Sequence, residues 1–106
     1  MKPVVFLGDA LRRVRGFPEI ARRTVGHELR DVQMGEDPSD WKFMPSVGPG
    51  VREIRLRDGP GAFRVVYLAN LESAIFVLHA FQKKTRATPH KDIDIARGRL
   101  RDLMTE

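Results

Sequence analysis

Positively charged side chains gather at the end of one apolar segment of this sequence. Residues 74–81 are almost uninterruptedly apolar, and Lys83, Lys84 and Arg86 follow them directly, before Pro89. An apolar run of this length, bounded by turn residues, is typical of a buried strand. Cations at the end of such a strand lie at the rim of a packed sheet, where they suit phosphate. We therefore expect an anion-binding site at this junction.

Two earlier segments are expected to bring arginines to the same place. Residues 51–57 alternate between apolar and charged, residues 62–69 are β-branched and aromatic, and Asp-Gly-Pro-Gly separates them. If the connections close without a bulge, Arg55 faces Arg64 and Arg64 faces His79 on the third strand. Because side chains alternate between faces, one face collects the charged residues. These are Glu53, Arg55, Arg57, Arg64, His79 and Lys83, together with Val66 and Phe81.

The opposite face of the three strands is expected to be the core beneath the helices. Its members are Ile54, Leu56, Phe63, Val65, Tyr67, Phe76 and Leu78. On the charged face, like charges placed directly opposite each other repel, so the pair Arg55 and Arg64 needs a counter-charge. Glu53 is the internal candidate and phosphate the external one. A bulge that breaks the register and lets the arginines splay into water is the alternative.

Helical segments are predicted before and after these strands. Residues 3–8 read as a short strand, 9–15 as a brief helix capped by Asp9, and the amphipathic pattern from Pro18 to Gly35 as a longer helix. Residues 36–50 are rich in Pro, Gly, Asp and Ser, which indicates a loop. A last helix, capped by Thr88, is predicted to begin at Pro89. The order predicts an α+β domain with an antiparallel sheet, a three-strand meander plus an N-terminal edge strand, packed on one face by helices.

Composition restricts the class of protein. The 106 residues suit a single domain spanning 1–106, 42% of them are hydrophobic, and there is no cysteine. The net charge is +5, and fourteen arginines outnumber five lysines. Nucleic acid or an acidic protein is therefore the expected partner. The three histidines lack metal-ligand spacing, so we expect no metal and no cofactor. Without a signal peptide or membrane span, a soluble cytoplasmic protein without membrane partners is expected.

The strand and junction motifs resemble one known group of proteins over nearly the whole chain. Val-Arg-Glu-Ile-Arg-Leu-Arg at 51–57, a glycine turn, Phe-Arg-Val-Val-Tyr at 63–67 and Leu-His-Ala-Phe-Gln-Lys-Lys-Thr-Arg-Ala-Thr-Pro at 78–89 carry the likeness. Together with Ile-Ala-Arg in the last helix, they resemble the RelE/HigB superfamily. Within it, they are most similar to the phage-derived, HigB-like toxins of type II toxin–antitoxin systems.

This resemblance implies the RelE-like fold and a toxin that cleaves translated mRNA in the ribosomal A site. It also implies a cognate antitoxin, commonly a helix-turn-helix protein, with mRNA and ribosomal RNA as further partners. By motif position, Arg64 contacts the scissile phosphate, Arg55 and Arg57 are basic neighbours, and Lys83 and Lys84 stabilise the transition state. Two positions depart from RelE itself: Glu53 replaces a lysine, and no tyrosine follows the lysine pair.

Such a nuclease must activate a ribose 2′-hydroxyl, stabilise the charged transition state and protonate the leaving oxygen. Arg64 with Lys83 or Lys84 is the candidate for electrostatic stabilisation. His79 is the candidate for proton transfer, against a structural role in the strand. Phe81 and Trp41 could stack on a base, with anchoring in the core or loop as the competing role of both. Arg86 could bind the RNA backbone. The alternative functions are a ParE-like gyrase inhibitor and a catalytically silent basic binding domain.

Overall fold

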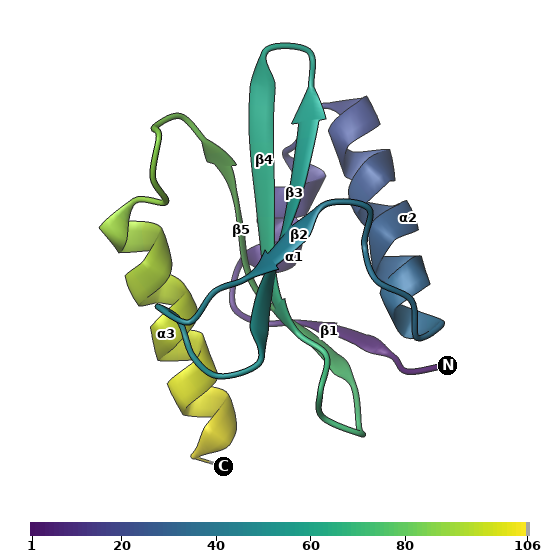
Figure 1. The fold of residues 1–106 in the computed structure, drawn as a ribbon, viewed down its shortest axis with the longest axis vertical. Helices are drawn as coiled ribbons and strands as arrows, with labels where there is room; N and C mark the ends of the chain where they lie inside the picture. Colours follow the sequence, from purple (N-terminus) through teal and green to yellow (C-terminus); the bar gives the residue numbers. More distant parts are fainter. Residues whose placement is uncertain (106) are drawn as a thin grey trace.

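The segments richest in β-branched and aromatic residues form the centre of a five-stranded sheet, which confirms the α+β prediction (Figure 1). The structure is a computed structural model and describes residues 1–105. The strand order is β1-β5-β4-β3-β2, so the three predicted strands occupy the middle. The elements are β1 (Val4–Phe6), α1 (Ala10–Arg15), α2 (Glu19–Gln33), β2 (Trp41–Phe43), β3 (Val51–Asp58), β4 (Gly61–Leu68), β5 (Ile75–Lys83) and α3 (His90–Met104).

The meander β3–β4–β5 is antiparallel, and the register of its first hairpin is as predicted, with Arg55 opposite Arg64. The second hairpin differs because β4 and β5 are interrupted by a bulge between Val66 and Tyr67. Val66 pairs with His79 and Tyr67 with Val77, which leaves Leu78 as the extra residue. One inserted residue shifts the partners beyond it. The pairing is already one residue off before the bulge, where Tyr67 pairs with Val77 and not with Phe76. The two shifts together place Arg64 opposite Phe81, and the prediction that it faces His79 is wrong.

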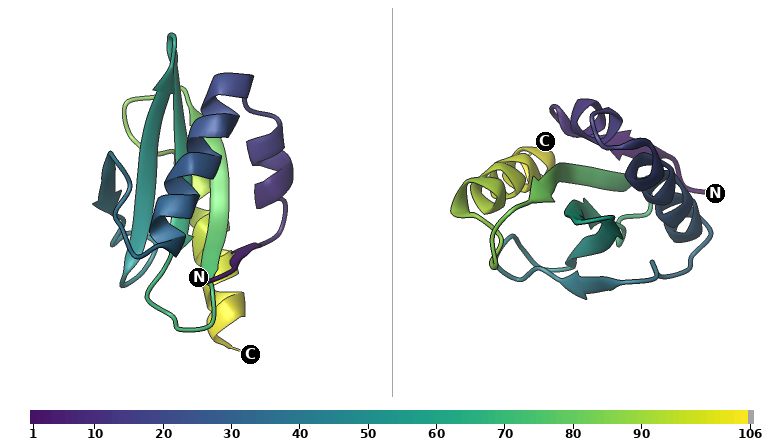
Figure 2. Two further views of the ribbon diagram at one scale, coloured as in Figure 1. Left: turned by 90° about the vertical axis from the view of Figure 1, so that its right-hand side faces the viewer. Right: turned by 90° about the horizontal axis from the view of Figure 1, so that it is seen from above.

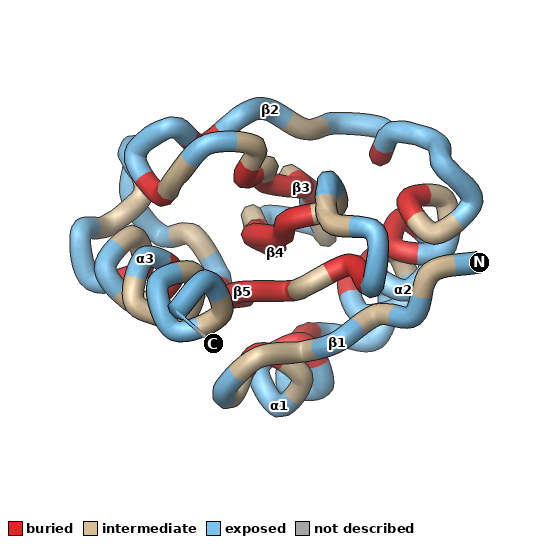
Figure 3. Tube along the Cα trace, turned by 90° about the horizontal axis from the view of Figure 1, so that it is seen from below, coloured by how far each residue is buried: buried red, intermediate tan, exposed pale blue. Residues whose placement is uncertain are grey.

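The two edge strands also differ from the sequence expectation. β1 pairs with β5 in parallel, so the sheet is mixed and not wholly antiparallel. β2 lies inside the segment predicted as a loop and pairs antiparallel with β3, with Lys42 opposite Glu53. The prolines and glycines around β2 are typical of a loop, and its three residues are too few to show the alternation of a strand. In Figure 3, seen from below, β2 is largely exposed, while β3, β4 and β5 are mostly buried.

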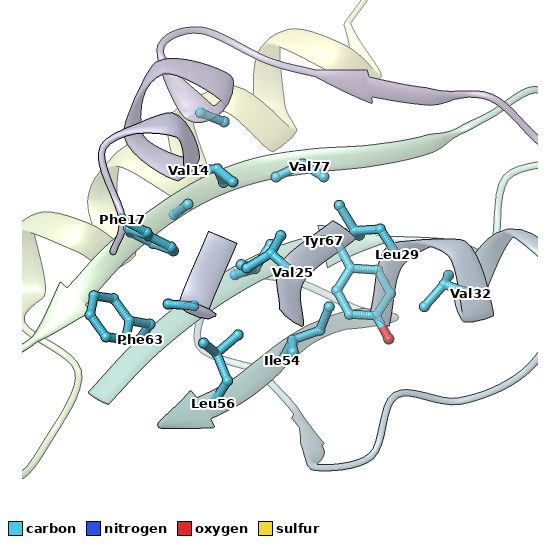
Figure 4. Packing of buried hydrophobic residues seen from close by; sticks show 14 of the residues in the cluster. Val14, Phe17, Val25, Leu29, Val32, Ile54, Leu56, Phe63, Tyr67 and Val77 are labelled. Carbon is cyan, nitrogen blue, oxygen red and sulfur yellow. The ribbon is translucent and has the colours of Figure 1, made fainter. Parts of the chain in front are cut away.

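Helices cover both faces of the sheet, so the expectation of a single covered face is wrong. Seen from above in Figure 2, α2 and α3 lie on opposite sides of the central strands. One buried cluster joins α1 and α2 to the sheet and includes Tyr67, as predicted; Figure 4 shows Tyr67 near Leu29 and Ile54. A second cluster joins α3 to the other face and includes Phe76 and Leu78, which were expected beneath the first helices.

Polar contacts hold α3 against β5. The Nε2 atom of His79 lies 2.7 Å from Oδ1 of Asp92. Arg99 donates one hydrogen bond to the carbonyl oxygen of Leu78, at the bulge, and another to Asp9. Asp9 was predicted to cap α1 but makes no side-chain cap bond. Its hydrogen bond with Arg99 instead holds the pKa of Asp9 well below its ordinary value, although partial burial opposes this shift.

Candidate functional site

A cationic cleft of about 330 Å³ lies where β2, β3, β4 and the end of β5 meet the segment before α3. Strand alternation explains its charge, since the residues that line it from β3 and β4 lie on one face and are all charged: Glu53, Arg55 and Arg64. Glu53 is the single acidic residue in its lining. The cationic side chains in the lining are Lys42, Arg55, Arg64, Lys83 and Arg86.

Arg64 and Glu53 form the buried floor of this cleft. The side chain of Arg64 is 7% exposed and that of Glu53 is 1% exposed, and Arg64 Nε lies 3.5 Å from Glu53 Oε1. The pKa of Arg64 is lowered, mainly by burial. The charge of Glu53 opposes this shift and the charge of Arg55 adds to it. An arginine nevertheless keeps its charge in proteins. Glu53 is therefore the internal counter-charge that was expected beside Arg64. Its carboxylate also accepts a hydrogen bond from the hydroxyl of Thr88, at 3.4 Å.

Arg55 carries the least compensated charge of the opposed pair. Its Nε atom is buried and has no hydrogen-bond partner. A buried donor left unpaired costs free energy, about 1–3 kcal/mol in a typical protein. Since Glu53 is held by Arg64, the cleft keeps an excess of positive charge and an unpaired donor. Both features favour a bound anion.

Lys83 lines the same cleft from the end of β5, because this strand extends to residue 83. Its ammonium group donates a hydrogen bond of 2.5 Å to the carbonyl oxygen of Arg86. Partial burial lowers the pKa of Lys83, and the nearby charges of Arg64 and Arg55 lower it further, whereas Glu53 opposes this. A lysine whose pKa moves toward neutrality is suited to proton transfer.

The other basic candidates divide among three places. Arg86 is exposed and lines the cleft beside Lys83. Arg57 is exposed and lies in an adjoining hollow with Asp40 and Arg55. Lys84 lines a separate groove beside α1 and α3, so the structure does not place it with Arg64.

His79 and Phe81 were expected to face RNA, and the structure buries both. His79 is 0% exposed beneath α3, where it pairs with Asp92, and it does not line the cleft. Phe81 belongs to the second core cluster, and its ring stacks against His79 with centroids 5.3 Å apart. The prediction that His79 lies on an open face is therefore wrong, because α3 covers the face of the sheet on which His79 lies. Phe81 lacks an open ring face for a base.

Burial lowers the pKa of His79 below its ordinary value of 6.5, although Asp92 opposes this shift. The unfolded chain then binds a proton more readily than the folded protein, so stability falls as pH drops below about 6.5. We expect the free energy of unfolding, measured by urea denaturation, to decrease through this range, whereas His79→Gln should flatten the decrease. Asp9, with its strongly lowered pKa, remains ionised here and contributes no slope. Equal slopes in both proteins would contradict this assignment.

Two cleft residues were not predicted from the sequence, because their segment is typical of a loop. Lys42 and Phe43 belong to β2 and line the cleft, and Phe43 is 56% exposed. The alternation Trp-Lys-Phe was the available signal, but three residues are too few to show a period. Trp41, a candidate for base stacking, is instead covered by the guanidinium of Arg52 at 4.0 Å from its ring centroid.

The cleft's donors suit an anion better than a cation. Within residues 1–105, no group of three or more histidine or acidic side chains is arranged to hold a metal ion.

Over the same residues, no helix combines the length and the apolar character needed to cross a bilayer.

The strand order, the helices and the cationic cleft define an α+β domain compatible with the RelE-like fold. Sequence comparison agrees with this class. Residues 12–101 match the phage-derived Gp49-like protein family, and the chain belongs to this family, which groups with RelE/HigB-like toxins. No curated protein matches the chain at a significant level.

Proposed function

We propose that this protein is the toxin of a type II toxin–antitoxin system and that it cleaves mRNA on the ribosome. One observation carries the proposal: Arg55 and Arg64 lie directly opposite each other at a cleft that holds one buried acid. Such a pair is unfavourable unless an anion joins it. The Gp49-like family supports the toxin class, and a cognate antitoxin is the proposed protein partner.

Arg64 and Arg55 bind the scissile phosphate in this proposal. Their guanidinium groups offer planar, paired donors that match phosphate oxygens. The ion pair between Arg64 Nε and Glu53 Oε1, at 3.5 Å, restrains the guanidinium group at the floor of the cleft. The attack on phosphorus places additional negative charge on the nonbridging oxygens. Prepositioned cations stabilise that charge without reorganisation, which is the largest contribution expected in such a site.

Lys83 performs the proton transfer in place of His79. Its neutral amine takes the proton from the ribose 2′-hydroxyl while that oxygen forms its bond to phosphorus. The bond to the 5′-oxygen breaks, and this oxygen receives a proton from water. The products are a 2′,3′-cyclic phosphate and a 5′-hydroxyl end. The pKa of Lys83 is lowered by partial burial and by the charges of Arg64 and Arg55, which favours the neutral amine that this step needs.

The exposed ring of Phe43, at the edge of the cleft, is the proposed stacking surface for a base. It is 56% exposed and borders the same cleft as Arg55 and Arg64. Base stacking on an aromatic ring contributes about 1–3 kcal/mol in single-strand binders. Arg86, which is exposed and lines the same cleft, is the proposed contact to an adjacent backbone phosphate.

Primer extension on a translated mRNA tests the proposal. Reactions with the purified protein, with and without ribosomes, are expected to show new 5′ ends only during translation. A parallel DNA supercoiling assay with gyrase should show no inhibition. Inhibition of gyrase without new RNA ends would replace the nuclease by a ParE-like activity. If the protein neither produces new RNA ends nor inhibits gyrase, the silent binding domain is the remaining alternative.

Replacing Lys83 with arginine separates binding from proton transfer. Arginine keeps the positive charge but stays protonated, so we expect kcat to fall about 10²-fold while KM changes less than threefold. The rise of kcat with pH that a titrating lysine produces should also disappear. Single-turnover cleavage across a pH series measures both effects. A wild-type kcat and pH profile in Lys83→Arg would remove Lys83 from the proton transfer.

A further inference from the structure

The two consecutive lysines at the end of β5 serve different surfaces. Lys83, the last residue of β5, lines the cleft, whereas Lys84, the residue after it, does not. Lys84 lines a second groove, also about 330 Å³, between the end of β5, α1 and the start of α3. Figure 1 shows the end of β5 close to the start of α3, with α1 behind the strand. The lysine pair therefore links two concave surfaces.

The second groove is cationic. Arg13 from α1, Lys84 after β5 and Lys91 from α3 line it, and all three are exposed. Its single acidic lining residue, Asp92, is buried and bound to His79 at 2.7 Å. Arg13 gives its Nε donor to Asp9, which leaves the other donors of its guanidinium group for a ligand. The groove thus retains net positive charge from three separate elements.

We propose that this groove binds a backbone phosphate of the RNA strand whose neighbouring nucleotides occupy the cleft. The inference rests on the proposed function, since the cleft supplies the first contact with that strand. Lys83 and Lys84 are adjacent in the chain, with Cα atoms about 3.8 Å apart, so the cleft and the groove lie on two sides of the end of β5. A strand that passes around this end from the cleft therefore meets Lys84. Polynucleotides carry phosphates at regular intervals, so two cationic sites joined in this way match one strand. The groove extends the binding site beyond the reacting phosphate.

This position explains why Lys84 is basic without belonging to the catalytic cleft. Lys84 and Lys91 hold the strand by charge and do not touch the reacting atoms. Their removal should therefore weaken the binding of RNA that is long enough to reach the groove. It should leave the binding of RNA confined to the cleft unchanged.

Binding of uncleavable RNA tests the proposal independently of catalysis. The probes are a trinucleotide and a dodecanucleotide of 2′-O-methyl RNA, which lack the attacking hydroxyl. The double variant Lys84→Ala/Lys91→Ala should bind the dodecanucleotide at least tenfold more weakly and the trinucleotide as the wild type does. Each lost phosphate contact should also reduce the slope of log K against log salt by about 0.7. The matched control, Arg23→Ala, removes an exposed cation of α2 that lines neither surface.

The outcomes separate this proposal from the proposed function. If the dodecanucleotide binds equally well to the wild type and the double variant, the groove is not an RNA site. An equal loss in Arg23→Ala would assign the effect to overall charge and would also overturn it. If the binding of an acidic peptide depends on Lys84 and Lys91 and the binding of RNA does not, the groove binds a protein partner and not RNA. Length-dependent binding without any cleavage would support the groove and refute the nuclease.

Discussion

Removing the charge of Arg64 is expected to lower the rate constant of mRNA cleavage by about 10²–10³-fold, the usual loss when one preorganised donor to a transition state is deleted. The substitution is best made as Arg64→Gln together with Glu53→Gln. Glu53 is 1% exposed, and a buried carboxylate without its partner would destabilise the fold. Glutamine at both positions removes the ion pair and keeps side chains that can form hydrogen bonds. Single-turnover cleavage on translating ribosomes measures the effect.

Two comparisons keep this first prediction specific. Glu53→Gln alone retains Arg64 and should reduce the rate constant less than tenfold, because the phosphate contact remains. Arg23→Gln, on the exposed face of α2, removes the same charge far from the cleft and should leave the rate unchanged. Circular dichroism confirms that each variant folds. Wild-type cleavage by the folded double variant would remove Arg64 from the mechanism.

The second large effect is on stability. We expect His79→Ala to lower the free energy of unfolding by about 3 kcal/mol, because it leaves the Asp92 carboxylate buried without its partner and opens a cavity beside Phe81. Adding Asp92→Ala should recover part of this loss, since the unpaired charge is then gone. Urea denaturation of both variants measures the coupling between the two residues.

The activity of His79→Ala distinguishes a structural histidine from a catalytic one. At a temperature where the variant is folded, cleavage per folded molecule should equal that of the wild type. A stable His79→Ala protein that has lost cleavage would return the proton transfer to His79.

The first hairpin shows what the sequence could predict. A four-residue turn between an alternating strand and a β-branched strand determines one register, so the pairing of Arg55 with Arg64 followed from the spacing. Strand alternation then placed Glu53 on the same face, and the structure has it beside Arg64. The position at which β5 ends was also predictable from the sequence, because the apolar run stops where Lys83 and Lys84 begin.

The rest depended on tertiary contacts that no local pattern reveals. The bulge at Leu78 is stabilised by Arg99 of α3, twenty-one residues away, which donates to the Leu78 carbonyl. The bulge shifts the partners of β4. His79 is covered by α3 and buried, although strand alternation alone predicted that it would be exposed. β2 is defined by its pairing with β3 and not by its own three residues. Two of the expected site residues were therefore core residues, and two cleft residues were missed.

The chemistry of the RNA ends tests the central claim most directly. Purified protein is added to ribosomes translating a defined mRNA, and the 3′ ends of the fragments are analysed. The cleft of Arg55, Arg64 and Lys83 predicts a 2′,3′-cyclic phosphate within the translated codons, with a 5′-hydroxyl on the partner fragment. The Arg64→Gln/Glu53→Gln protein should leave the mRNA intact. Intact mRNA with the wild-type protein, or fragments ending in a 3′-hydroxyl, would contradict the account.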